Sequence, residues 1–319
     1  MVPTYNRRPV LECTIECLLQ QEFPEGEYEV VVVDDQSTDD TAEWLAGAAA
    51  QNDRLTAIRN PSKGRGQARN AGIRAAHGET ICFVDDDVWV VPGFVAAHWA
   101  AHQRYGPKAV IVGRLDVSLE TAKTIANEYE DERLVRVEER IQAAKDNLHP
   151  GFFRTGNVSV RAHFLQEVGG FDEGFTGYSY EDSELGYRLL ANGAEFRYAP
   201  DAAGEHYTAT STADVLRKQA EAGRSAVTFL RRWPEAVERL SVPFAVPGVP
   251  TTAKRDGMIR RVAKWLLLSR PCGLAMGWLM VAAEMAGWKR GSFFLLDWLG
   301  WTKYARAFRE AARDGCSAG

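Results

Sequence analysis

The chain of 319 residues predicts an α/β fold in which a mostly parallel sheet has helices on both faces. Two observations in the N-terminal half predict this fold. Short β-rich runs alternate with segments of helical periodicity, and the run YEVVVV at residues 28–33 is continuous enough for a strand buried on both faces. The composition, with 45% hydrophobic and 25% charged residues, is that of a globular domain with room for an extension.

The expected elements follow one another in a regular order. Pro9 suits the first turn of a helix, Ser37 or Thr38 can cap a second helix, and Gly78 can end a third. The predicted elements are a helix over 9–21, a strand over 28–33, a helix from 36–40 to 50, a strand over 55–59, a helix within 64–76 and a strand over 80–84.

Aspartates stand at the ends of two of these strands. Asp34 and Asp35 follow the first strand, and Asp85, Asp86 and Asp87 follow the last, in the stretch FVDDDVWV. In open α/β sheets, ligands bind outside the carboxyl ends of the strands, so both clusters should face one crevice. Neighbouring carboxylates repel unless a cation neutralises them, and Mg²⁺ takes carboxylate and phosphate oxygens. The sequence therefore predicts a metal–diphosphate site, with a turn or helix cap as the alternative for either cluster alone.

Several motifs in a fixed order resemble the family 2 glycosyltransferases of GT-A fold. They are PTYNR (3–7), VVVDDQSTDDT (31–41), GQARNAGI (66–73), FVDDD (83–87), TGNVS (155–159), GGFDEGF (169–175) and YEDSELGYRL (180–189). The resemblance covers roughly residues 1–210, the expected Rossmann-like catalytic domain. It implies an inverting enzyme that moves a sugar from a nucleotide-diphosphate sugar, with UDP-sugar favoured, to an acceptor hydroxyl, with Mg²⁺ or Mn²⁺ as cofactor.

The resemblance also implies roles for residues of the donor site. Thr4 and Asp35 match contacts to the donor nucleobase, and a carboxylate at a strand end can accept from the N–H of uracil. Asp85 and Asp87 match the DxD motif, in which Asp87 is the expected metal ligand. Asp85 is a second metal ligand or, like Asp86, lies near the ribose.

Four further residues, Glu181, Asp182, His206 and Arg69, complete the implied site. Asp182 matches the base that takes the proton from the attacking acceptor hydroxyl, and Glu181 would orient the acceptor or the base. Complementing a helix dipole is the alternative for this pair. His206 would be a third metal ligand or a diphosphate contact, unless its role is structural. Arg69 would contact nucleotide or phosphate, or else be a solvated helix arginine.

The sequence leaves the acceptor and two rival functions open. Glycan, lipid-linked and small-molecule acceptors all fit, in polysaccharide, glycolipid or cell-envelope glycan synthesis. A non-catalytic nucleotide-sugar-binding module is one rival. A sugar-1-phosphate nucleotidyltransferase is the other, but it should open with a glycine-rich basic loop where this chain has PTYNRR. The net charge of −5, without a long basic block, argues against nucleic acid as a partner.

The cysteines and the N-terminus bear on where the protein is expected. Five cysteines without a CxxC pair, and an N-terminus without a signal-peptide pattern, predict a reducing, cytoplasmic location. Only Met1 and Val2 precede PTYN, where the family has an apolar strand. We therefore expect that the natural sequence starts upstream, with that strand apparently truncated here.

Residues 211–319 are expected to form a helical extension. A helix is predicted over 213–232, followed by a proline-marked linker at 234–250 and by a segment, 254–270, with six basic residues and one acid. Tryptophan-rich apolar segments follow. One interpretation is peripheral contact with an anionic membrane at its inner face. The other is packing against the core or a second subunit. The longest uncharged run in this region is too short to cross a bilayer.

Overall fold

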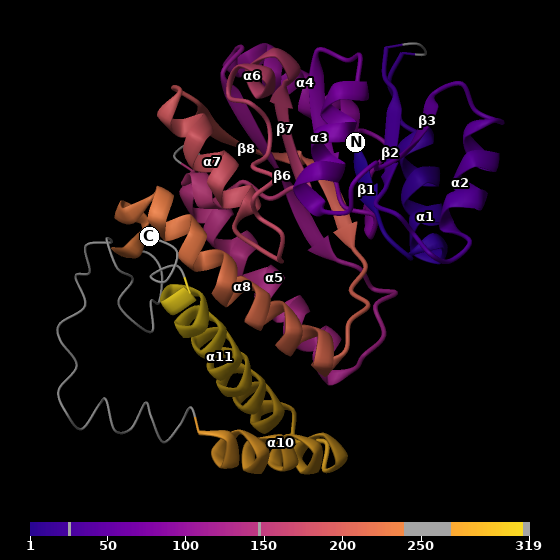
Figure 1. Cartoon of the computed structure of the whole chain (residues 1–319). Helices are drawn as coiled ribbons and strands as arrows, with labels where there is room; N and C mark the ends of the chain where they lie inside the picture. The colour runs from indigo at the N-terminus through magenta and orange to yellow at the C-terminus, as the bar shows by residue number, and fades with distance from the viewer. Residues whose placement is uncertain (25–26, 146–147, 239–268, 315–319) are drawn as a thin grey trace. The chain divides into compact units, whose positions relative to one another are not determined.

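The computed structural model describes residues 1–24, 27–145, 148–238 and 269–314 (Figure 1). Among these, the strands are β1 Val2–Thr4, β2 Val30–Asp34, β3 Leu55–Arg59, β4 Thr80–Val84, β5 Val88–Val90, β6 Ala109–Val117, β7 Asn157–Arg161 and β8 Glu195–His206. The α-helices are α1 Arg8–Leu19, α2 Thr41–Ala49, α3 Arg65–Ala75, α4 Phe94–Tyr105, α5 Ile125–Ala144, α6 Ala162–Glu167, α7 Glu181–Ala191, α8 Thr212–Arg232, α10 Arg270–Met285 and α11 Lys289–Asp314. The predicted α/β class is confirmed.

The sheet is parallel in its N-terminal part and mixed beyond it. Strands β1, β2 and β3 pair in parallel, because α1 and α2 return the chain to the same end each time. The second group has the order β4-β7-β6-β8-β5, in which only β6 and β8 are parallel. The Val84 N–H donates to the Met1 carbonyl at 3.1 Å, which brings β4 beside β1. The parallel pairing predicted from the first strands therefore does not extend to β5 and β7.

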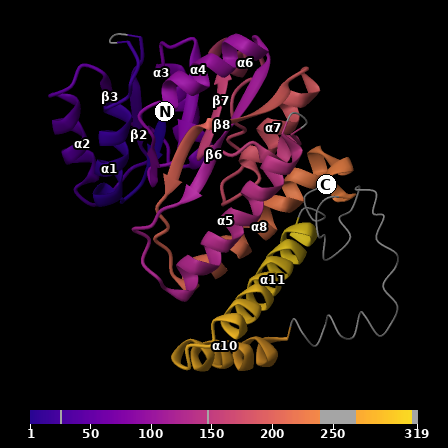
Figure 2. The same cartoon turned by 180° about the vertical axis from the view of Figure 1, so that it is seen from behind.

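Helices cover both faces of the sheet, as predicted (Figures 1 and 2). Val31 and Val33 of β2 join the core that includes side chains of α3, α5, α6 and α7. Val30 and Val32 point the other way, into the core that includes side chains of α1, α2 and α4. Each fully buried valine contributes about 1.5–3 kcal/mol through burial. This is why YEVVVV reads as continuously apolar and not as an alternating strand.

Two histidines form a neutral polar chain inside this core. His98 and His102, on one face of α4, are each 1% exposed. The Ser159 hydroxyl lies 2.8 Å from His98 Nδ1 and 2.9 Å from His102 Nε2, and His98 Nε2 lies 2.9 Å from Asn157 Oδ1. If His102 donates to Ser159, Ser159 to His98 and His98 to Asn157, each of these three bonds has one donor and one acceptor with both rings neutral. Burial lowers the pKa of His98 to about 4 and that of His102 to about 3.

We expect His102→Phe to weaken the acid sensitivity of the fold. Below pH 6.5 the unfolded chain takes up a proton at this histidine that the folded chain cannot, so wild-type stability falls as the pH falls. Between pH 6.5 and 5 one such group contributes about 2 kcal/mol. Urea unfolding at pH 7 and pH 5 should show that the variant loses about that much less than wild type. His163→Phe, on an exposed histidine, is the matched control, and equal losses in His102→Phe and wild type would contradict the neutral chain.

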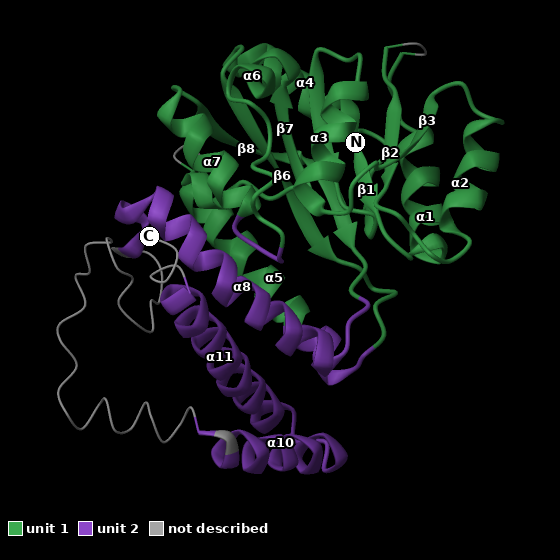
Figure 3. Ribbon diagram, viewed as in Figure 1, with its two compact units in different colours: residues 1–122, 130–176, 181–208 green, residues 123–129, 177–180, 209–319 purple. Residues whose placement is uncertain are grey.

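The described residues divide into two compact units (Figure 3). Unit 1 comprises residues 1–122, 130–176 and 181–208, and unit 2 comprises residues 123–129, 177–180 and 209–319. The boundary near residue 208 lies close to the predicted one at 210, but whether the parts are separate domains stays a prediction. Among the described helices, none has the length and apolarity needed to cross a membrane.

The described residues of unit 2 from 211 onward are mostly helical, as expected for this extension. Helix α8 packs along α11, where the Gly223 backbone approaches Tyr304 so closely that a Cβ would lie 2.2 Å from its carbonyl oxygen. Helix α10 packs on α11 in turn. Most of the predicted linker, and the basic segment except for residues 269–270, lie outside the described residues.

Candidate active site

The structure brings the two aspartate clusters to the same edge of the sheet. The Asp35 N–H, just after β2, donates to the Thr4 carbonyl at the end of β1 with a length of 2.8 Å. The Thr4 hydroxyl in turn donates to Asp86 Oδ2, just after β4, at 2.8 Å. These neighbours are 31 and 82 residues apart in sequence. The carboxyl ends of three strands therefore meet where the sequence predicted one crevice.

Asp35 is held by the loop after β3. Its carboxylate accepts from Asn60 Nδ2 at 2.7 Å and from the Gly64 N–H at 2.9 Å. Gly64 has a φ of 151°, and a Cβ there would lie 2.1 Å from the side-chain oxygen of Gln67. Glycine thus allows the backbone amide to approach the carboxylate. Asp35 is partly exposed and retains oxygen lone pairs for a ligand.

The middle aspartate of the three is bonded to the end of β1. Asp86 is 7% exposed, bonded to Thr4, with Arg7 Nε 3.6 Å from its Oδ1. Burial raises its pKa to about 7, although Arg7 opposes this. Arg7 also pairs with Asp87 at 3.0 Å. Through Asp86, the segment Asp85–Asp87 (the DDD segment) is therefore bonded to β1. Sequence analysis gave Arg7 no role, although it stands inside the PTYNR motif.

Arg69 lies at the centre of an acidic cluster. Its guanidinium is 3.0 Å from Glu181 Oε1, 3.5 Å from Asp182 Oδ1 and 3.9 Å from Asp85 Oδ1. The side chains of Arg69 and Glu181 are 5% and 4% exposed, so the alternative of a solvated helix arginine is wrong. Burial alone would lower the pKa of Arg69, but Asp182, Glu181 and Asp85 together raise it. Burial raises the pKa of Glu181.

Asp182 is oriented by Thr155, two residues before β7. The Thr155 N–H and hydroxyl both donate to Asp182 Oδ2, at 3.2 and 3.0 Å. This leaves Oδ1 facing Arg69, and the carboxylate side chain is 24% exposed. Next to Thr155, a Cβ on Gly156 would lie 3.1 Å from Asp85 Oδ2. The antiparallel pairing of β7 with β4 produces this approach, because the start of β7 then lies at the end of β4.

His206 lies beside the last aspartate. Its Nε2 is 3.6 Å from Asp87 Oδ1, and its Nδ1 is 3.0 Å from the Thr208 hydroxyl, which donates to Asp131 at 2.7 Å. The pairing of β5 with β8 sets this position, since Val88 lies opposite His206. Across the described ranges, no three or more His, Cys, Asp or Glu side chains converge as a metal centre. Asp87 and His206 are thus two neighbouring groups that could bind a metal ion, and they do not form a complete set of metal ligands.

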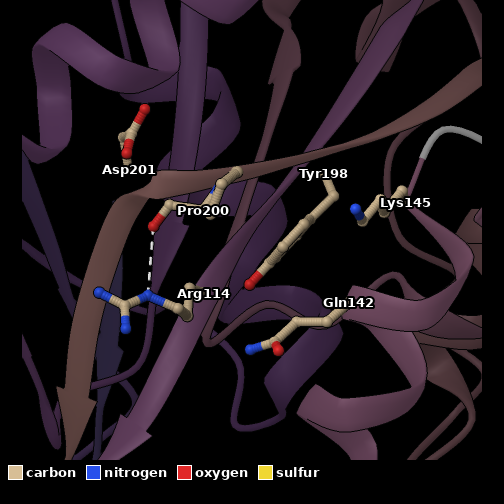
Figure 4. Close-up of a pocket in the computed structure, with 6 residues that line it drawn as sticks. All are labelled: Arg114, Gln142, Lys145, Tyr198, Pro200 and Asp201. Atoms are coloured by element: carbon tan, nitrogen blue, oxygen red, sulfur yellow. Dashed lines mark hydrogen bonds between the residues drawn. The ribbon is translucent and has the colours of Figure 1, made fainter.

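A cavity of about 570 Å³ lies elsewhere in unit 1 (Figure 4). It is lined by residues of β6, of β8 and of the α5 region, namely Arg114, Gln142, Lys145, Tyr198, Pro200 and Asp201. Arg114 Nε donates to the Pro200 carbonyl at 3.2 Å across the irregularity between β6 and β8. None of the predicted site residues lines this cavity, so it is not the site described above.

Comparison with known proteins identifies the family. The sequence model described as "Glycosyl transferase family 2" matches residues 1–169, a range that includes Thr4, Asp35, Arg69 and Asp85–Asp87. The chain belongs to glycosyl transferase family 2. A second model, "N-terminal domain of galactosyltransferase", matches residues 138–211, which include Glu181, Asp182 and His206. The family expected from the motifs is confirmed.

Curated relatives of this family 2 chain are longer than the chain itself. Validoxylamine A glucosyltransferase of Streptomyces hygroscopicus subsp. limoneus is 34% identical over 218 residues, covering 60% of this chain and 48% of the relative. Chondroitin synthase of Escherichia coli is 30% identical over 234 residues, covering 65% and 34%. The chain thus spans about half the length of such relatives, or less.

Solved glycosyltransferases share the fold. The mannosyltransferase PcManGT from Pyrobaculum calidifontis, in complex with GDP-Man and Mn²⁺, gives a TM-score of 0.58 at 20% identity and covers 97% of this chain and 85% of that one. The protein TarS 1–349 of S. aureus, in complex with UDP-GlcNAc, gives 0.52 at 16% identity, covering 99% and 90%. At these identities the likeness concerns the fold, and it confirms the GT-A fold expected for the family.

Proposed function

We propose that the protein is a metal-dependent, inverting glycosyltransferase that moves a sugar from a nucleotide-diphosphate sugar, with UDP-sugar favoured, to an acceptor hydroxyl. The observation that carries this proposal is the Asp182 carboxylate. One of its oxygens is held by two donors of Thr155, and the other faces Arg69, which also lies 3.9 Å from Asp85. An oriented, partly exposed carboxylate next to a nucleotide-binding edge is what base-assisted transfer needs.

In the proposed reaction, the acceptor oxygen attacks the anomeric carbon of the donor sugar. The bond from that carbon to the diphosphate oxygen breaks as the new C–O bond forms, and the nucleoside diphosphate leaves with the electron pair. Asp182 takes the proton from the acceptor hydroxyl. A single displacement inverts the anomeric configuration. Arg69 lies between Glu181 and Asp182 and holds both carboxylates in place, so Glu181 would orient the base through Arg69.

The residues present fit a divalent cation that is shared with a ligand. Asp87 and His206 lie 3.6 Å apart, and Asp85 lies on the same DDD segment. Carboxylate oxygens suit Mg²⁺ and Mn²⁺, imidazole is tolerated, and Mg²⁺ usually completes its shell with water and phosphate oxygens. A bound cation would neutralise the charge of the leaving diphosphate. Its ligands would be Asp87, then Asp85 and His206, with the diphosphate supplying others.

The remaining residues of the edge would bind the nucleoside. Asp35 and Thr4 lie side by side at the ends of β2 and β1, and the lone pairs left on Asp35 can accept from a uracil N–H. Asp86 would act on the ribose side, where its contacts with Thr4 and Arg7 fix the segment. Glycan, lipid-linked and small-molecule acceptors all remain compatible with the proposal.

We expect UDP and one UDP-sugar to raise the melting temperature only when Mn²⁺ or Mg²⁺ is present. At a ligand concentration of 100 times Kd the stabilisation is about 2.7 kcal/mol. A thermal-shift panel of nucleoside diphosphates and nucleotide sugars, with and without metal, measures this. The variant Asp87→Ala should abolish the shift, because it removes a metal ligand.

The matched control for this panel is Asp201→Ala, which removes an exposed carboxylate in the cavity of Figure 4. It should keep the full shift. A shift that survives Asp87→Ala but is lost in Asp201→Ala would move the nucleotide site to that cavity. Metal-dependent binding with no sugar transfer to any acceptor or to water would favour the binding-module alternative.

A further inference from the structure

The outer face of α10 carries large apolar side chains. Leu274 is 69% exposed, Trp278 76% and Met285 85%. Val281, which is 48% exposed, lies on the same side of α10, and Trp288, 64% exposed, follows just after the end of the helix. On the opposite side of the helix, Met280 and Ala283 are buried in the cluster that α10 shares with α11. Among the described residues, the packing of α10 on α11 therefore covers one side of an apolar helix and leaves the other side exposed. Figures 1 and 2 show α10 crossing one end of α11.

The composition of α10 is not that of a water-exposed helix. Between residues 271 and 288 the single charged residue is Glu284. A helix that is apolar all round is normally buried, in a protein core or against lipid. Contiguous apolar patches of this kind on a soluble surface mark an interaction site. Something other than water should therefore cover the outer face.

The distribution of charge along the sequence indicates what covers the outer face of α10. Residues 209–319 contain 18 Lys and Arg against 9 Asp and Glu, a net charge of +9, whereas residues 1–208 contain 20 against 34, a net charge of −14. The exposed residues Lys289 and Arg290 follow the apolar face directly. An acidic N-terminal part joined to a basic C-terminal part is an asymmetry typical of proteins that bind an anionic surface.

We infer that the outer face of α10, defined by Leu274, Trp278, Val281 and Met285, lies on an anionic lipid bilayer. Tryptophans prefer the boundary between headgroups and acyl chains, and nearby basic residues attract anionic headgroups. With 16 residues, α10 is too short to span the hydrocarbon core, so the helix lies in the interface plane. A symmetric pair of chains joined through this face would bring two basic regions together, whereas anionic lipid neutralises them.

The test is co-sedimentation of the full chain with vesicles. Wild type should pellet with vesicles of phosphatidylglycerol and phosphatidylcholine at low salt, and at least tenfold less with phosphatidylcholine alone or at high salt. The double variant Trp278→Glu/Met285→Glu should bind the anionic vesicles at least tenfold more weakly. Because both side chains are highly exposed, its melting temperature should match wild type. The matched control is Leu119→Glu, which places the same charge at an apolar residue of unit 1 that is 90% exposed.

Three results would overturn the inference. The first is wild type that stays in solution with anionic vesicles. The second is a double variant that pellets as well as wild type. The third is a lipid-free wild type whose mass by light scattering is that of a dimer, with the double variant monomeric, because the face would then be an interface between two copies. None of these results depends on nucleotide binding or turnover, so they are separate from the test of the proposed function.

Discussion

Asp182→Asn should lower kcat by about 10³-fold and leave donor binding intact. General-base catalysis contributes roughly 10²–10⁴-fold, and an amide cannot take the acceptor proton. The substitution keeps the size of the side chain, and its oxygen can still accept from the Thr155 N–H and hydroxyl. Because the proposed metal ligands are untouched, the metal-dependent thermal shift with nucleotide should be that of wild type.

The measurement is release of the nucleoside diphosphate from the donor, with a panel of glycan and small-molecule acceptors and with water alone. Asp201→Asn makes the same chemical change on an exposed carboxylate and should keep wild-type kcat. If Asp182→Asn turns over at the wild-type rate, Asp182 is not the base. If it loses nucleotide binding as well, Asp182 belongs to the donor site and the roles assigned above must be exchanged.

The strands of this site, and the aspartates at their carboxyl ends, could be predicted from the sequence. Strands β3 and β4 have the predicted bounds, Leu55–Arg59 and Thr80–Val84. Local signals suffice for these elements, because each is a short apolar run that ends in turn-forming or acidic residues. The parallel-sheet rule then placed Asp35 and Asp86 at one edge, where they are joined through Thr4.

Contacts made across the antiparallel strands could not be predicted in this way. Thr155 reaches Asp182 only because β7 runs against β4, and no periodic signal in residues 155–159 shows the direction of a strand. Arg7 offered no signal beyond its place in a motif, since an arginine at the start of a helix is usually solvated. Its partners, Asp86 and Asp87, are about 80 residues away in the sequence.

The burial of polar residues in helix α3 could not be predicted from the sequence either. Its residues 66–73, GQARNAGI, are polar on average, yet all but Gln67 are buried. Hydrophobic periodicity predicts which apolar face is buried, but a polar face is buried only when it has partners elsewhere. Asn70 has its partners in the 171–173 segment, and Arg69 has its closest one in Glu181, 112 residues away.

The variant Arg69→Met should lower the free energy of unfolding by about 3–5 kcal/mol near neutral pH. Arg69 and Glu181 are almost fully buried and lie 3.0 Å apart, so removing the cation leaves a buried carboxylate without its closest charge partner. Turnover should also fall steeply, since Asp182 loses the cation 3.5 Å from Oδ1. Methionine fills much of the space beside Phe171, over which the guanidinium lies at 5.4 Å, and this limits any cavity.

The pH dependence of the stability lost in Arg69→Met distinguishes the effect of an unpaired charge from the effect of a cavity. Burial already raises the pKa of Glu181, and without Arg69 the pKa rises further. The folded variant then keeps a proton that the unfolded chain releases above about pH 4.3, so its stability falls as the pH rises through the folded pKa. Urea unfolding should therefore show a larger gap from wild type at pH 8 than at pH 5.5. A cavity alone would give the same gap at both.

The double variant Arg69→Met/Glu181→Gln tests whether the unpaired Glu181 carboxylate causes the loss of stability. A buried ion pair often adds little net stability over neutral groups of similar volume, whereas a buried carboxylate without its partner is strongly destabilising. The double variant should therefore recover most of the stability lost in Arg69→Met, without the pH dependence. Turnover should stay low, because the cation that positions Asp182 is still missing. Recovery of both stability and turnover would mean that Arg69 serves only to neutralise Glu181 and has no part in holding the base.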